Sequence, residues 1–110
     1  MAFRMTQQAY LVLLALADRP RHGYAIVQEV LTLSDGEVRL GAGTLYGLLD
    51  RMLGEGLVAK DREEVVDGRL RRYYRLTPDG GSAATTETAR LGALARRART
   101  VLNRPALGEA

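Results

Sequence analysis

The sequence predicts a mainly α-helical domain that carries one β-hairpin and ends in a long helix. Three observations predict it. Apolar residues recur at helical spacing over residues 45–53. The pattern then alternates on both sides of Asp67-Gly68, a dipeptide typical of two-residue hairpin turns. After Thr77 the chain is rich in Ala, Leu and Arg, which favours one long helix.

The first two helices are expected at residues 6–17 and 23–33. The first is apolar almost throughout and has Thr6 as a plausible N-cap, and Pro20 follows its end. The second has apolar residues on one face and ends at Ser34-Asp35-Gly36. Residues 37–40 then alternate polar and apolar, which predicts a short strand.

The third helix has the clearest stripe, formed by Leu45, Leu48, Leu49, Met52 and Leu53. Gly56 suits the left-handed residue after its end, with Leu57 packed back on the helix. Residues 58–66 and 69–76 are expected to be the strands of the hairpin, with Tyr74 in the core and Tyr73 half-exposed. For Arg75, pairing with an acidic residue of the neighbouring strand is as good an expectation as a contact outside the domain.

Thr77-Pro78 opens the last helix, which we expect to reach about Asn103. The order of elements is that of a winged helix-turn-helix followed by one extra helix. The fold class is therefore mainly α with a β-hairpin wing, a winged helix-turn-helix plus a C-terminal dimerisation helix. The expected divisions are residues 1–76 for the winged helix, 77–103 for the helix and 104–110 for a frayed tail.

Composition excludes several classes of function. The 110 residues are 46% hydrophobic and 26% charged, as in an ordinary globular domain. There is no cysteine and only one histidine, so we expect no disulfide framework, no metal site and no cofactor. No nucleophile–base arrangement is recognisable, so we do not expect an enzyme. Without a signal pattern or a long apolar run, we expect a cytoplasmic protein that does not insert into membranes.

Three stretches resemble the PadR family of transcriptional regulators: residues 22–26 (HGYAI), 43–58 (GTLYGLLDRMLGEGLV) and 67–80 (DGRLRRYYRLTPDG). The resemblance covers about residues 6–80. Gly47 and Leu70 stand where the family often has proline, so we expect local differences in rigidity. The resemblance implies a DNA-binding homodimer that acts mainly as a repressor. Its single C-terminal helix places it in the shorter subgroup, which includes regulators that sense ligands at the dimer interface.

The third helix would enter the major groove, as the second helix of a helix-turn-helix does, and the hairpin would reach phosphates or the minor groove. Tyr24 is expected in the core. The DNA-binding candidates are His22, Thr44, Tyr46, Arg51, Arg69, Arg71 and Arg72. The plainer reading is a glycine-rich helix start, a solvated arginine face and a capping histidine. A winged helix that presents its arginines to an acidic protein partner stays an alternative function.

Helical spacing gives the last helix an apolar seam without an obvious partner in so short a chain. The dimer-interface candidates are Tyr10 and Leu13 of the first helix and Leu91, Leu94, Ala98 and Val101 of the last. Two-fold symmetry then predicts a pseudo-palindromic DNA target. The chain has no tryptophan and no aromatic residue after Thr77, which disfavours a stacked planar drug as effector. Three possibilities remain for the effector: a smaller apolar ligand, a ligand that contacts Tyr10, or no ligand at all.

Overall fold

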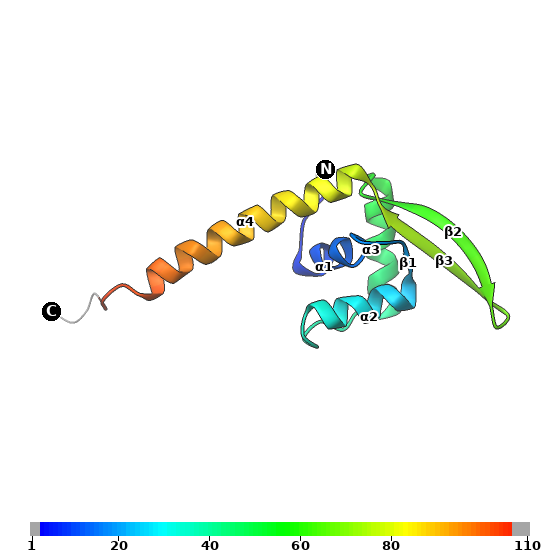
Figure 1. Cartoon of the computed structure of the whole chain (residues 1–110), viewed down its shortest axis with the longest axis horizontal. Coiled ribbons are helices and arrows are strands. Elements are labelled where there is room, and N and C mark those ends of the chain that lie inside the picture. Colours follow the sequence, from blue (N-terminus) through cyan, green and yellow to red (C-terminus); the bar gives the residue numbers. More distant parts are fainter. Residues whose placement is uncertain (1–2, 107–110) are drawn as a thin grey trace.

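The computed structural model describes residues 3–106 and has the order of elements of a winged helix-turn-helix followed by one helix (Figure 1). The helices are α1 (Gln7–Ala15), α2 (Gly23–Leu33), α3 (Ala42–Gly54) and α4 (Pro78–Leu102). The strands are β1 (Arg21–His22), β2 (Val58–Val66) and β3 (Arg69–Leu76), in the sheet order β1-β3-β2 with antiparallel pairing.

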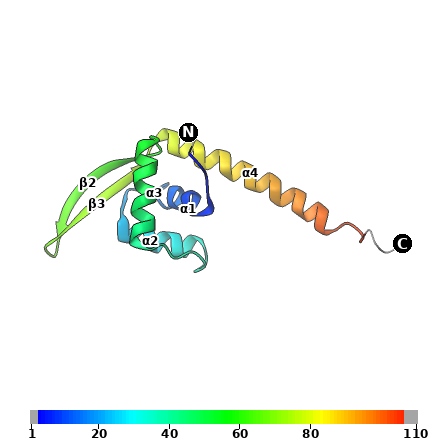
Figure 2. The ribbon, with the colours of Figure 1, turned by 180° about the vertical axis from the view of Figure 1, so that it is seen from behind.

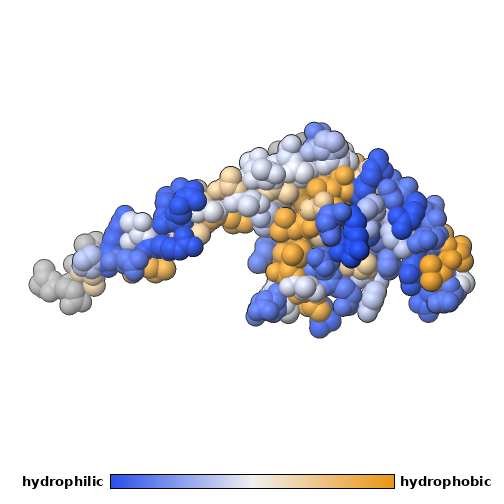
Figure 3. All heavy atoms as spheres, viewed as in Figure 1, coloured by the Kyte–Doolittle hydropathy of each residue, from blue (hydrophilic) through white to orange (hydrophobic). Residues whose placement is uncertain are grey.

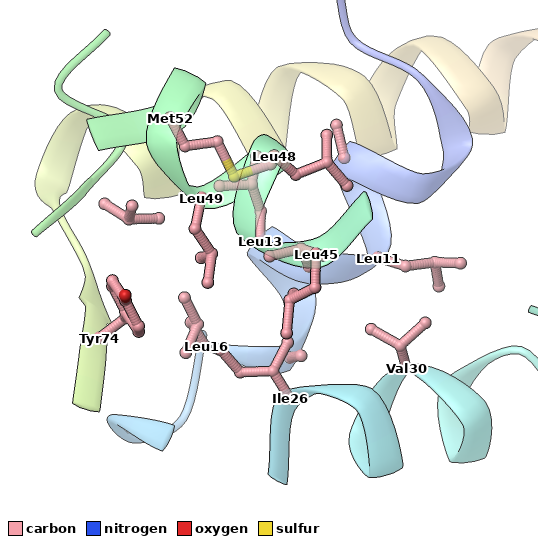
Figure 4. Packing of buried hydrophobic residues seen from close by; sticks show 14 of the residues in the cluster. Leu11, Leu13, Leu16, Ile26, Val30, Leu45, Leu48, Leu49, Met52 and Tyr74 are labelled. Carbon is pink, nitrogen blue, oxygen red and sulfur yellow. The ribbon is translucent and has the colours of Figure 1, made fainter. Parts of the chain in front are cut away.

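The core lies where α1, α2 and α3 meet the base of the hairpin. Side chains from the three helices converge there, and Tyr74 of β3 closes one side (Figure 4). Its largest fully buried side chains are Leu13, Ile26, Leu45, Leu49, Met52, Val12 and Val30. The apolar stripe of α3 therefore faces inward, as predicted, and leaves the start of that helix free on the surface.

The turns that follow α3 have the predicted chemistry. Gly56 has a φ of 73°, and the Leu57 amide donates to the Met52 carbonyl over 2.9 Å, the long bond of a Schellman cap. At the hairpin tip, Asp67 and Gly68 have φ values of 51° and 74°, as a type I′ turn requires. The register shifts between Lys60 and Glu63, where an irregularity bends β2.

Helix α4 leaves the domain at one end and projects far beyond it, on the side away from the hairpin (Figure 2). Its start is fixed to the end of α3. The Thr77 hydroxyl donates to the Gly56 carbonyl over 2.6 Å, and Gly80 packs so closely on the Leu57 carbonyl that a β-carbon at Gly80 would overlap it. About two turns further along α4, the Tyr10 hydroxyl lies 2.6 Å from that of Thr88 and ties α1 to α4.

The prediction of a strand at residues 37–40 is wrong. These residues form no strand, and the third strand is β1, whose Arg21 and His22 pair with Tyr74 and Tyr73. Residues 104–106 lie beyond the end of α4, and the rest of the predicted 104–110 tail is outside the described residues. Over the described part of the chain, no helix combines the length and apolarity that a membrane span needs.

Candidate nucleic-acid interface

The start of α3 is open to solvent. Gly41 occupies the N-cap position and supplies no side-chain hydrogen bond, and the first turn contains no acidic residue. Residues 41–44 are all exposed. By contrast, Thr6 and Thr77 cap α1 and α4 with their hydroxyls. The free N–H groups and the positive dipole end of α3 are therefore available to an anion.

A hollow of about 450 Å³ lies between the start of α2 and the hairpin. It brings together five of the seven DNA-binding candidates: His22, Tyr46, Arg69, Arg71 and Arg72. Tyr46 reaches it from α3, and its hydroxyl lies where a side chain at Gly23 would otherwise be. Because Gly23 has no side chain, α3 and α2 can both contribute to this surface.

The arginines of the hairpin differ in their partners. Among residues 3–106, Arg69 and Arg71 form no ion pair, whereas Arg72 lies 3.8 Å from Glu63 across the strands. The sequence left open an ion pair of Arg75 with an acidic residue of the neighbouring strand, but within residues 3–106 its guanidinium instead donates to the Lys60 carbonyl over 2.7 Å. Arg69 and Arg71 are thus the hairpin arginines whose positive charge is offset neither by an ion pair nor by a hydrogen bond within residues 3–106.

His22 is half-buried at the N-cap of α2, where it makes no capping hydrogen bond. Its ring stands edge-on to Tyr73, with 5.2 Å between the ring centroids. Burial lowers the pKa of His22, and the positive charge of Arg71 lowers it further. The neutral imidazole is therefore more favoured at His22 than in an ordinary histidine.

The two remaining candidates lie on α3 outside the hollow. Thr44 is exposed in the first turn of α3, at the open helix start. Arg51 is exposed near the opposite end, where it lines a separate hollow with Phe3 and Glu55. The structure therefore leaves Thr44 at the open start of α3, outside the hollow, and does not bring Arg51 to the other candidates.

Sequence reasoning misplaced one tyrosine and missed one arginine. Tyr24 was expected in the core, but it is 70% exposed and lines the hollow. Arg21 is only 8% exposed. It donates to the Ala15 carbonyl over 2.7 Å and pairs with Asp18 at 2.7 Å and Glu29 at 3.7 Å. Arg21 thereby joins the end of α1 to α2, through the Ala15 carbonyl and Glu29, and no local pattern in the sequence indicated this.

The seam predicted on α4 is uncovered in the single chain. Leu94 and Val101 are 47% and 53% exposed, and apolar surface continues from α4 onto the adjacent face of the domain (Figure 3). Tyr10 is half-buried beneath α4. Leu13, in contrast, is fully buried in the core of its own chain. It has no surface to offer a partner, so its place among the interface candidates is wrong.

Comparison with known proteins identifies the family. The model of the transcriptional regulator PadR-like family matches residues 12–86. The chain is 44% identical over 80 residues to transcriptional regulator Rv3488 of Mycobacterium tuberculosis, covering 73% of this chain and 71% of that protein. The crystal structure of a PadR family regulator from Eggerthella lenta is 30% identical, with a TM-score of 0.72, over 89% of this chain and 83% of that one. A PadR family regulator from Clostridium difficile, 23% identical, shares the fold with a TM-score of 0.72 over 86% of this chain and 97% of that one. The chain belongs to the PadR-like family of transcriptional regulators.

Proposed function

We propose that this protein binds double-stranded DNA sequence-specifically and represses transcription as a homodimer. The observation that carries the proposal is the open, uncapped start of α3 beside two hairpin arginines, Arg69 and Arg71, that form no ion pair within residues 3–106. A helix start of this kind suits the major groove, and unpaired arginines suit phosphates. Repression needs no further surface, because an occupied operator excludes other proteins from the same DNA.

The homodimer is part of the proposal. Four seam residues of α4 supply its apolar surface: Leu91, Leu94, Ala98 and Val101. Burial of such residues against a second copy removes apolar area from water, which is the main favourable term in association. Two copies related by a two-fold axis would place their α3 helices about one DNA turn, roughly 34 Å, apart. The operator is then a pseudo-palindrome.

We place any effector beside the same seam. A hollow of about 440 Å³ lies there, with Tyr10, Leu11, Leu33 and Leu91 in its lining beside the charged Glu37, Glu87 and Arg90. With no tryptophan in the chain, this lining lacks the large stacking surface that suits a planar drug, which favours a small ligand or none. In a displacement assay on operator-bound protein with a panel of planar cationic dyes and phenolic acids, the dyes should not release DNA at low micromolar concentration. Release by the dyes alone would contradict this choice.

The test of the function is selection of bound sequences from a pool of random duplexes, followed by competition with a scrambled duplex at fixed ionic strength. A sequence-specific regulator prefers the selected duplex by at least about a thousandfold. Equal competition by the scrambled duplex would contradict the proposal. It would favour the alternative in which the arginines of the hairpin meet an acidic protein.

A further inference from the structure

We propose that the hollow between α2 and the hairpin binds one backbone phosphate of the DNA, with the Tyr24 hydroxyl and the Arg71 guanidinium as its main donors. The inference rests on the proposed DNA binding and deepens it. It names the group bound at this place and adds a residue that sequence reasoning assigned to the core.

The exposure of Tyr24 is the first observation. Tyr24 is the second residue of α2 and is 70% exposed, while Ile26 and Val30 of the same helix are fully buried. Its hydroxyl makes no hydrogen bond to any residue that the structure describes. A large aromatic side chain held in water with a free hydroxyl, on the wall of a hollow, is available to a ligand that accepts a hydrogen bond.

The charge of the lining is the second observation. Three arginines line the hollow, at positions 69, 71 and 72, and none of its lining residues is a carboxylate. Glu64 lies opposite Arg71 in the strand register, but its ion-pair partner is Arg62, at 3.7 Å. The neighbouring hollow along β2 is different, because Asp61 and Glu63 line it together with Lys60, Arg62 and Arg72. An anion is therefore attracted more strongly to the first hollow, whose cationic lining no lining carboxylate offsets, than to the second.

The position of the hollow selects the occupant. It is open on one side and, at about 450 Å³, much larger than a phosphate ion, so it leaves room for the sugars on either side of a phosphodiester. Tyr46 of α3 shares its wall with Arg71 of β3. A phosphate held there would touch α2 and the hairpin at once. It would thereby fix the position of α3 along the duplex without contacting a base.

The test combines Tyr24→Phe with single methylphosphonates placed in turn along the selected duplex. The variant keeps the ring and loses only the hydroxyl. It should bind the selected and the scrambled duplex about tenfold more weakly, since one hydrogen bond to a charged group is lost. A methylphosphonate at one position of the duplex should weaken binding by the parent protein. The same substitution should cause a clearly smaller loss of affinity for Tyr24→Phe. Arg71→Gln should show a reduced penalty at the same position.

Tyr73→Phe is the matched control, because it also removes one tyrosine hydroxyl, but Tyr73 lines the neighbouring hollow, where Asp61 and Glu63 lie beside the cations. It should bind like the parent protein. If the parent binds DNA while Tyr24→Phe binds as tightly and shows the same methylphosphonate pattern, this inference fails and the proposed function stands. If the parent binds no duplex, both fail. Inorganic phosphate at constant ionic strength should not displace the duplex; displacement from the parent but not from Tyr24→Phe would show a free-anion site instead.

Discussion

Removal of Arg69 and Arg71 together should flatten the salt dependence of DNA binding. Each phosphate contact contributes about 0.9 to the slope of log affinity against log salt, so the two arginines should contribute about 1.8. Between about 50 mM and about 200 mM salt, the parent should therefore lose about twelvefold more affinity than Arg69→Ala/Arg71→Ala. Arg72 is left in place, because Glu63 already neutralises part of its charge.

The assay is fluorescence anisotropy of the selected and the scrambled duplex over a salt titration. Both duplexes should be affected alike, since phosphate contacts carry no sequence information. The control is Arg96→Ala/Arg99→Ala, which removes the same charge from exposed positions of α4 that helical spacing places away from the seam. A double hairpin variant with the parent slope, or a control with an equal change, would refute the assignment of the hairpin to DNA.

The other predictions concern stability, assembly and pH. Gly80→Ala should lower the free energy of unfolding by about 2 kcal/mol, because its β-carbon would meet the backbone of Leu57; Gly81→Ala, which has room, should raise it by about 0.5 to 1 kcal/mol in urea titrations. Leu94→Glu should give a monomer in sedimentation at micromolar concentration, because it would bury an unpaired carboxylate; a persisting dimer would contradict the seam. The lowered pKa of His22 means that the unfolded chain binds more protons in mild acid, so stability should fall as pH drops from about 7.5 to about 5.5, and His22→Gln should remove that part of the loss.

Features with local causes were predicted correctly from the sequence. The stripe of α3, the left-handed Gly56 and the turn at Asp67-Gly68 each depend on residues within one or two helical turns or on the backbone freedom of one residue. The hydroxyl caps at Thr6 and Thr77 are local in the same sense. These features suffice to order the elements and therefore to predict the fold class.

Features that depend on distant residues were not predicted. Strand β1 is two residues long and exists only because β3, some fifty positions later, pairs with it. The alternation at residues 37–40 was too short to distinguish a strand from a loop. Helix α1 is apolar on almost every side because it lies inside the domain, so its sequence does not show that Leu13 faces inward.

The candidate site shows the same division. The arginines near the hairpin tip could be found from their sequence positions, because a two-residue turn fixes where they lie. The role of Tyr24 could not, since helical periodicity assigns it to the apolar face while the hairpin that forms the opposite wall comes from another part of the chain.

A chemical-interference footprint on the selected duplex tests the central claim most directly. Two copies of the chain that each insert α3 into the major groove should give two symmetric clusters of essential contacts, with centres about ten base pairs apart on one face of the duplex. Each cluster should contain major-groove positions and a flanking group of phosphates, and Arg69→Ala/Arg71→Ala should erase only part of the flanking phosphates. A single unpaired cluster, or weak interference spread evenly along the duplex, would contradict the account of a dimer that reads DNA through α3 and the hairpin.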